Sequence, residues 1–179
     1  MTILYAIPAG IVVGLLLGGR LEGLTSMRFR WAPLAIGGLL VQIVLFTSLG
    51  DRIAGAAGPA VYVASTLAVF VAVLRNVRLG GMAVVAGGAL CNLAAIVANG
   101  GSMPADPGAL AIAGFEGPGD HTNSVVVADP ALRPLTDIFA VPAWIPFANV
   151  FSVGDLLIAV GIAWAIAASM RAAKVSPTG

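Results

Sequence analysis

The feature that most constrains this chain is a series of five long apolar runs separated by charged residues. The runs cover residues 2–19, 31–50, 53–74, 79–98 and 149–170, and Asp155 is the one charged residue within them. A bilayer core about 30 Å thick is crossed by a helix of about 20 apolar residues. Backbone groups in hydrocarbon are satisfied only in helices or closed barrels. The runs therefore predict an all-α membrane protein, with about five transmembrane helices in a single transmembrane domain.

Composition predicts that lipid covers most of the surface of this chain. Charged residues make up 9% of the sequence and hydrophobic residues 59%, whereas soluble domains carry about 25% charged residues. The net charge of +1 and the absence of a basic run argue against a nucleic-acid partner. Cys91 is the single cysteine and His121 the single histidine, so we expect no disulfide, no metal site and no cofactor.

The basic residues predict how the helices are oriented. Seven of the nine fall after the first, third and fifth runs: Arg20, Arg28, Arg30, Arg75, Arg78, Arg171 and Lys174. Cytoplasmic connections carry the excess of Lys and Arg, so we expect the N-terminus outside and the C-terminus inside. Residues 99–148 then form one long external loop. Its Gly- and Pro-rich stretch from Gly117 to Asn123 is predicted to be mobile, and its apolar stretch around Trp144 to lie against the membrane or the helices.

Three glycines at four-residue spacing, Gly10, Gly14 and Gly18, lie in the first apolar run. Such spacing places small residues on one helix face, where a second helix can approach closely. The second helix belongs either to the same chain or to another copy in a homo-oligomer. We favour packing within the chain, because neighbouring helices need a contact face, and the homo-oligomer remains the alternative.

The start of the fifth run carries the most informative polar residues, and two interpretations fit them. The sequence Phe-Ser-Val-Gly-Asp places Ser152 three residues before Asp155, which is a variant of the capping box at a helix N-terminus. An acidic side chain also suits the positive end of the helix dipole. Alternatively, Asp155 is functional, because ionisable groups at membrane depth often mark sites. Asp137 lies eighteen residues upstream, and two carboxylates facing one water act as an acid and base pair.

The segment from Leu135 to Ile162 resembles the C-terminal region of signal peptidase II, the lipoprotein signal peptidase. Leu-Thr-Asp-Ile-Phe and Phe-Ser-Val-Gly-Asp are similar to the two segments that carry the catalytic aspartates of that family. Gly-Gly-Ala-Leu-Cys-Asn-Leu, which contains Asn92, resembles a third. The resemblance implies Asp137 and Asp155 as a catalytic dyad, with Asn92 and Ser152 in support. Ser152 and Gly154 depart from the family's asparagine and alanine, and the family's Asp-Arg pair after the asparagine is missing.

A second resemblance extends over the whole chain. Gly-Gly-Arg-Leu from Gly18, Asn-Gly-Gly-Ser-Met-Pro from Asn99 and Phe-Ser-Val-Gly-Asp from Phe151 are similar to motifs in a family of small bacterial membrane proteins of unknown function. This resemblance implies a multi-pass protein of the bacterial cytoplasmic membrane, and it makes Asn99 a further supporting residue. It implies no activity.

Two functions are therefore open. The first is a non-catalytic accessory or scaffold protein, in which Asp155 is a cap and the external loop docks a membrane-protein partner. The second is an aspartic endopeptidase that cleaves a lipoprotein substrate at the outer membrane face. The first is favoured at this point, because motif matches without structural context are often accidental.

Overall fold

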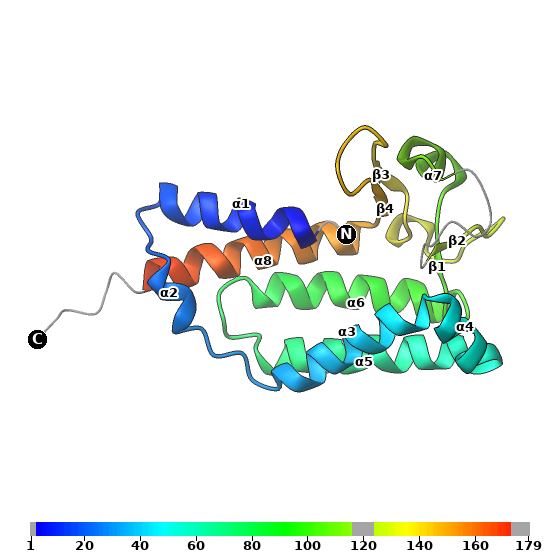
Figure 1. Cartoon of the computed structure of the whole chain (residues 1–179), viewed down its shortest axis with the longest axis horizontal. Helices are drawn as coiled ribbons and strands as arrows, with labels where there is room; N and C mark the ends of the chain where they lie inside the picture. Colours follow the sequence, from blue (N-terminus) through cyan, green and yellow to red (C-terminus); the bar gives the residue numbers. More distant parts are fainter. Residues whose placement is uncertain (1–2, 116–123, 173–179) are drawn as a thin grey trace, which may run out of the picture.

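The computed structural model describes residues 3–115 and 124–172 of the chain. Within them, five apolar helices run along the length of the molecule (Figure 1). These helices are α1 (Ile3–Leu16), α3 (Ala32–Leu45), α5 (Gly58–Arg75), α6 (Met82–Ala98) and α8 (Val153–Ala172). Two shorter helices, α2 (Glu22–Thr25) and α4 (Ser48–Ala54), lie in the connections, and the 3-10 turn η1 (Gly55–Ala57) joins α4 to α5.

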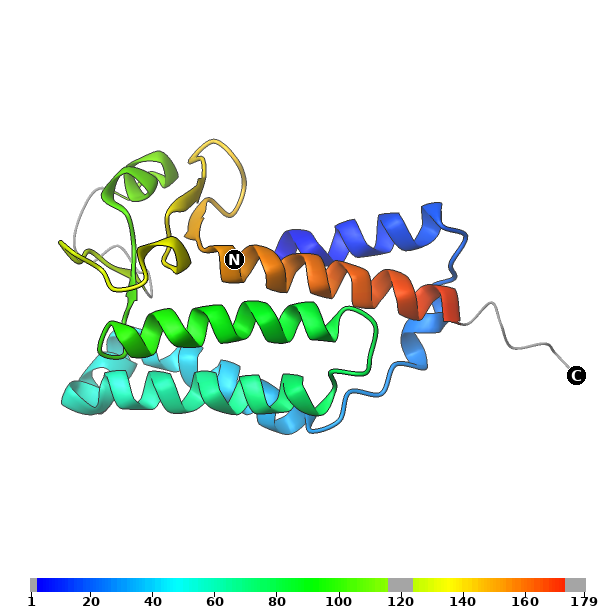
Figure 2. The same ribbon diagram turned by 180° about the vertical axis from the view of Figure 1, so that it is seen from behind.

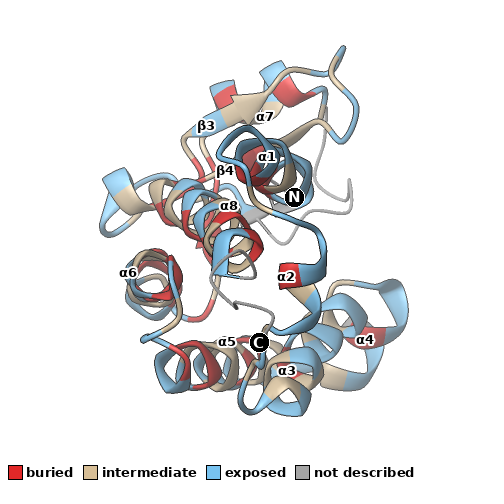
Figure 3. Ribbon diagram, turned by 90° about the vertical axis from the view of Figure 1, so that its left-hand side faces the viewer, coloured by how far each residue is buried: buried red, intermediate tan, exposed pale blue. Residues whose placement is uncertain are grey.

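The helices pack in an order that differs from their order in the chain. α1 contacts α8, α8 contacts α6, α6 contacts α5, and α5 contacts α3, and the end-on view shows this succession (Figure 3). The last helix therefore lies between the first helix and α6. As a result, the N-terminal end of α8 is brought beside the C-terminal half of α6, although more than fifty residues separate them in sequence.

Glycines allow the close approach of α1 to α8. A Cβ on Gly10 would lie 2.8 Å from the carbonyl oxygen of Ala163, and a Cβ on Gly14 would lie 3.3 Å from the Cα of Ala167. This glycine face is thus covered by a helix of the same chain, which is the packing that we favoured from the sequence. Gly18 lies beyond α1 in the following turn, with a φ of 74°. A homo-oligomer through these residues stays a prediction.

Two helical segments are long and apolar enough to cross a membrane: Ser48–Arg75, with 28 residues, and Val153–Ala172, with 20. The other three apolar helices among the described residues have 10–17 residues. α1 and α3 end before the runs 2–19 and 31–50 do, because Gly18 turns the chain and because Thr47 starts a new helix. The Thr47 hydroxyl accepts a hydrogen bond of 3.1 Å from the Gly50 N–H. Transmembrane passage of all five helices stays a prediction.

The outer faces of the helices expose large apolar side chains. Leu16 is 81% exposed and Ile53 is 74% exposed, and similar residues continue along α1, α3, α5 and α8. The pale blue parts of the ribbon in Figure 3 mark the exposed residues of the helices. Monomeric soluble proteins rarely expose contiguous apolar patches of more than a few hundred Å². An apolar surrounding, such as lipid, therefore suits this surface better than water does.

Residues 99–148 contain more structure than a long external loop suggests. They hold β1 (Met103–Pro104), α7 (Pro107–Ala113), β2 (Ser124–Val125), η2 (Arg133–Leu135) and β3 (Phe139–Val141), and β4 (Asn149–Phe151) follows them. β1 pairs with β2 in parallel and β3 pairs with β4 antiparallel. The fold is thus helical with two small sheets, and not purely helical. Prolines interrupt helices here, and short extended pairs satisfy the backbone instead.

One sequence expectation for this region is corrected by the structure, and another falls outside the described residues. Because β4 occupies Asn149–Phe151, α8 begins at Val153 and not at residue 149. The stretch predicted to be mobile, Gly117–Asn123, lies outside the described residues, and so does His121.

The strands and α7 gather at one end of the helices, as Figures 1 and 2 show from opposite sides. The opposite end holds α2, the turn between α5 and α6, and the end of α8. There the Arg20 N–H donates a 2.9 Å hydrogen bond to the carbonyl oxygen of Met170. The Arg-rich connections after α1 and α5 therefore meet the C-terminal end of α8 at this end of the bundle.

Candidate active site

The N-terminus of α8 is closed by a reciprocal cap. The Asp155 N–H donates a 3.0 Å hydrogen bond to the hydroxyl of Ser152, and the Ser152 N–H donates a 3.2 Å bond to Oδ2 of Asp155. These two bonds are those of a capping box, which satisfies backbone donors that a helix start leaves unpaired. The capping geometry expected from the sequence is therefore present.

Asn92, on α6, joins this cap through its side chain. Its Nδ2 donates a 2.8 Å hydrogen bond to Oδ1 of Asp155, and its Oδ1 accepts a 2.8 Å bond from the Ser152 hydroxyl. A Cβ on Gly154 would lie 2.7 Å from Cγ of Asn92, so a glycine at this position leaves the space that the asparagine occupies. Both carboxylate oxygens of Asp155 thus accept hydrogen bonds from N–H donors.

Asp137 reaches the same region from a different part of the chain. Its backbone bridges to the end of β1 and the residues after it: the Asp137 N–H donates 2.9 Å to the carbonyl of Pro104, and the Asp106 N–H donates 3.0 Å to the carbonyl of Asp137. These bonds fix the position of Asp137 beside α6. The residue is 3% exposed, which is unusual for an aspartate.

A polar pocket of about 100 Å³ brings the two aspartates together. Its polar lining consists of Tyr62, Asn92, Asp137, Asn149 and Asp155, and apolar residues close the remaining walls. A buried water needs roughly 10–15 Å³ of probe-occupied volume and two to four polar partners, so the pocket has room for more than one water. No Lys or Arg is among the described residues that line it.

This arrangement can carry acid and base chemistry. Two carboxylates from separate elements border one small polar space, and the described residues that line it include no Lys or Arg. Such a pair can divide the roles of general base and general acid towards one water molecule. The described residues contain no group of three or more His, Cys, Asp or Glu side chains arranged to hold a metal.

The other supporting residues play different parts. Ser152 contributes through the cap. Asn99 does not line the polar pocket. Instead, it holds the chain before η2, because its Nδ2 donates 2.9 Å to the carbonyl of Ala131 and its Oδ1 accepts 2.9 Å from the Ala131 N–H. These two bonds fix the segment that leads to Asp137.

Sequence reasoning missed Tyr62 and Asn149 as lining residues of the pocket. Tyr62 is a polar-tipped aromatic residue within an uncharged run, which is a weak signal by itself. Asn149 stands three residues before the capping serine and was assigned to the start of the last helix. It is placed at the pocket because β4 replaces the expected first turn of that helix.

The fold and the site define a class: a bundle of apolar helices with an apolar outer surface and a polar, aspartate-lined pocket at one end. The chain belongs to DUF5317, a family of unknown function, whose family model matches residues 26–167. Membership of a family of unknown function agrees with the resemblance noted above. No curated protein and no solved structure matches the chain. The resemblance to signal peptidase II therefore stays a prediction.

Proposed function

We propose that this protein is a membrane-embedded hydrolase that uses Asp137 and Asp155 as an acid and base pair. The observation that carries the proposal is the single polar pocket of about 100 Å³ that both aspartates line. Sequence spacing alone did not require the two residues to meet, since Asp137 follows η2 and Asp155 belongs to α8.

The roles of the two aspartates follow from their contacts. Asp155 accepts one N–H hydrogen bond on each oxygen, which leaves each carboxylate oxygen a further lone pair that can accept a proton. Asp155 is therefore the general base that takes a proton from water. The water oxygen attacks the carbonyl carbon of an amide, and Asp137 donates its proton to the leaving nitrogen. The substrate class that the resemblance suggests is a membrane-anchored lipoprotein precursor.

The membrane setting belongs to the same proposal. All five apolar helices cross the cytoplasmic membrane of a bacterium, with the N-terminus outside and the C-terminus inside. The exposed apolar side chains of α1, α3, α5 and α8 support this arrangement. α1 and α3 have 14 residues each, or about 21 Å at about 1.5 Å per residue. Local bilayer thinning accommodates such short helices at modest cost.

Substitution by asparagine tests the hydrolase. Asparagine keeps the shape of aspartate and accepts hydrogen bonds, but it cannot take up or release the proton. Asp137→Asn and Asp155→Asn are each expected to abolish cleavage of a lipoprotein precursor by the reconstituted protein. They are also expected to abolish complementation of a strain depleted of its own signal peptidase II. Full activity of both variants, with normal expression, would end the proposal.

A non-catalytic accessory or scaffold role is the second candidate, and the capping box favours it. Ser152 and Asp155 satisfy each other's backbone N–H groups, which by itself accounts for an acidic residue at this position. In this role, Asp155→Asn leaves function intact, and the strand-rich end of the bundle contacts a membrane-protein partner. Partner capture that survives both asparagine substitutions would support this second candidate.

A further inference from the structure

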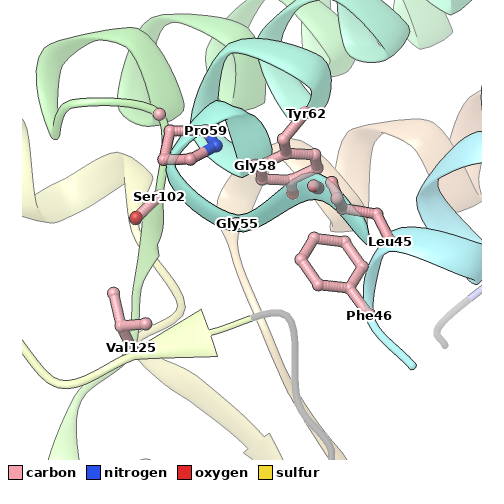
Figure 4. A pocket seen from close by; sticks show the side chains of 10 residues that line it. Leu45, Phe46, Gly55, Gly58, Pro59, Tyr62, Ser102 and Val125 are labelled. Atoms are coloured by element: carbon pink, nitrogen blue, oxygen red, sulfur yellow. The ribbon is translucent and has the colours of Figure 1, made fainter. Parts of the chain in front are cut away.

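A second pocket, larger and mainly apolar, lies next to the polar one. Its volume is about 210 Å³. One wall comes from the end of α3 and the start of α5, where Leu45, Phe46, Pro59 and Tyr62 lie, and the other comes from Ser102 and Val125 (Figure 4). None of these lining residues carries a charge.

Tyr62 is shared by the two pockets. It lines the apolar pocket and the polar pocket alike, and it is only 6% exposed. Its ring meets the ring of Phe46 edge to face, with 4.9 Å between the centroids and 84° between the planes, which is a favourable aromatic geometry. Tyr62 therefore lies, closely packed, between the apolar pocket and the two aspartates.

The sizes of the pockets limit what they hold. Pockets that enclose a whole drug-sized ligand measure about 300–1,000 Å³, and the apolar pocket is smaller. It fits one substituent of a larger molecule. The polar pocket on the other side of Tyr62 is smaller still, and it fits water and a single polar bond.

We propose that the apolar pocket binds one large aliphatic or aromatic group of the substrate, next to the amide bond that the aspartates hydrolyse, and that Tyr62 is the specificity-determining residue between them. This inference rests on the proposed hydrolase function. It assigns the substrate class as a peptide with a bulky apolar group beside the scissile amide. That group is either an amino-acid side chain or a fatty acyl chain, since both present the same hydrocarbon surface to the pocket.

Gly58 provides a way to fill the pocket without touching the aspartates. It lines the apolar pocket, and a Cβ there would meet nothing nearer than the Cβ of Ala54 at 4.0 Å. Its φ of −46° is helical, so Gly58→Leu introduces no backbone strain. Gly87 on α6 is the matched control, because a Cβ there also meets nothing within 4 Å and Gly87 lies outside both pockets.

The binding test uses two photoreactive probes on the full chain in lipid nanodiscs. One is an alanine-glycine peptide carrying a single photoreactive leucine analogue, and the other is a fatty acid with a diazirine near its chain end. Cross-linking of one or both probes to Leu45 and Phe46 is expected to fall at least tenfold in Gly58→Leu and to stay unchanged in Gly87→Leu. The probe that labels identifies the source of the apolar group. Equal labelling of the two variants, or labelling of neither residue by either probe, would overturn the inference.

A turnover test separates this inference from the hydrolase proposal. Gly58→Leu is expected to raise KM at least tenfold for a substrate with a bulky apolar group beside the scissile bond. It should leave kcat, and the KM for a matched glycine-containing substrate, nearly unchanged. Asp155→Asn should lose turnover but keep the cross-links. Cross-links that persist while every variant, including the wild type, lacks turnover would refute the hydrolase and still locate the apolar pocket. An unchanged KM ratio would refute the specificity role.

Discussion

The two ends of the helix bundle use polar side chains in opposite ways. At the end that holds α2, Asn76 bonds the backbone of Arg30 twice, at 2.7 Å in each direction, and the Arg75 guanidinium lies 5.7 Å from the centre of the Trp31 ring. At the other end, the Asn92 side chain donates a hydrogen bond to the Asp155 carboxylate and accepts one from the Ser152 hydroxyl.

The difference is that the first arrangement fixes a backbone connection, whereas the second joins side chains beside a pocket. At the end that holds α2 and the Arg-rich connections, here called the basic end, the amide of Asn76 joins the connection before α3 to the end of α5. At the end that holds Asp137 and Asp155, here called the aspartate end, the bonded side chains lie beside a pocket of about 100 Å³.

The largest effect is expected from a test of sidedness, which is all or none. In a Cys91→Ala background, Val126→Cys lies at the aspartate end and Val77→Cys in the turn after α5, and both native residues are exposed. Because basic connections stay cytoplasmic, an impermeant maleimide applied to intact cells should label Val126→Cys alone. Val77→Cys should be labelled only after permeabilisation. The reverse pattern would invert the proposed orientation.

A neighbouring pair of glycines on α6 tests how the aspartate end is held together. A Cβ on Gly88 would lie 2.9 Å from both the Cβ of Leu157 and the backbone nitrogen of Ile158, whereas a Cβ on Gly87 meets nothing within 4 Å. Gly88→Ala is expected to destabilise the protein by about 1–3 kcal/mol through overpacking. Gly87→Ala should be neutral or stabilising by about 0.5–1 kcal/mol. The free energy of unfolding of each variant is measured in lipid by steric trapping. Equal stabilities of Gly88→Ala and Gly87→Ala would contradict the close packing at Gly88.

Two serines at opposite ends of α8 sharpen the comparison further. The Ser152 hydroxyl caps the helix and bonds Asn92, whereas the Ser169 hydroxyl donates 2.8 Å to the carbonyl of Ala165 in its own helix. Ser152→Ala is expected to cost about 0.5–2 kcal/mol, the usual range for a lost N-cap. Ser169→Ala should cost less than that in the same unfolding measurement. A larger cost at Ser169 would remove the distinction between the ends.

The smallest expected effect is a pH dependence at α7. The hydrogen bond from the Ala109 N–H lowers the pKa of Asp106, Gly108 and Arg133 act in the same direction, and desolvation opposes them. Because the folded-state pKa is lowered, this stabilisation is present above the ordinary value of 3.8 and is lost as pH falls through the folded-state pKa. Acidification to about pH 3 should therefore lower the protection factors of the α7 amides, which compare the measured hydrogen exchange with the intrinsic exchange rate at the same pH. The protection factors of α7 should change less with pH in Asp106→Asn than in the wild type. An equal change in both would contradict the role of Asp106.

The helical part of the fold could be predicted from the sequence, because a long uncharged run that crosses hydrocarbon satisfies its backbone groups by forming a helix. Each of the five runs contains a helix, and Ser152 and Asp155 form the expected cap. Helix ends were less accessible. α3 stops at Leu45 because Thr47 begins another helix, and no change in hydropathy marks that position.

The candidate site could be predicted only in part, because it depends on contacts between distant segments. Asp137 and Asp155 were proposed from the sequence as a pair, but the pocket that they share requires Asp137 to pair with the chain at the end of β1 and after it. Nothing in the local sequence specifies that pairing. Tyr62 and Asn149 were missed for the same reason, since each reaches the pocket through the packing of α5 and β4 and not through a motif.

The measurement that tests the central claim most directly is the additivity of the two asparagine substitutions. Cleavage rates of the wild type, Asp137→Asn, Asp155→Asn and the double variant are compared in the same nanodiscs, with Ser152→Ala as the control for a weakened cap. Groups that act as one unit lose their contribution together. The account predicts that each single variant loses nearly as much kcat as the double variant, while Ser152→Ala keeps most of its kcat. Small losses that add, or a loss confined to one aspartate, would contradict a shared catalytic pocket.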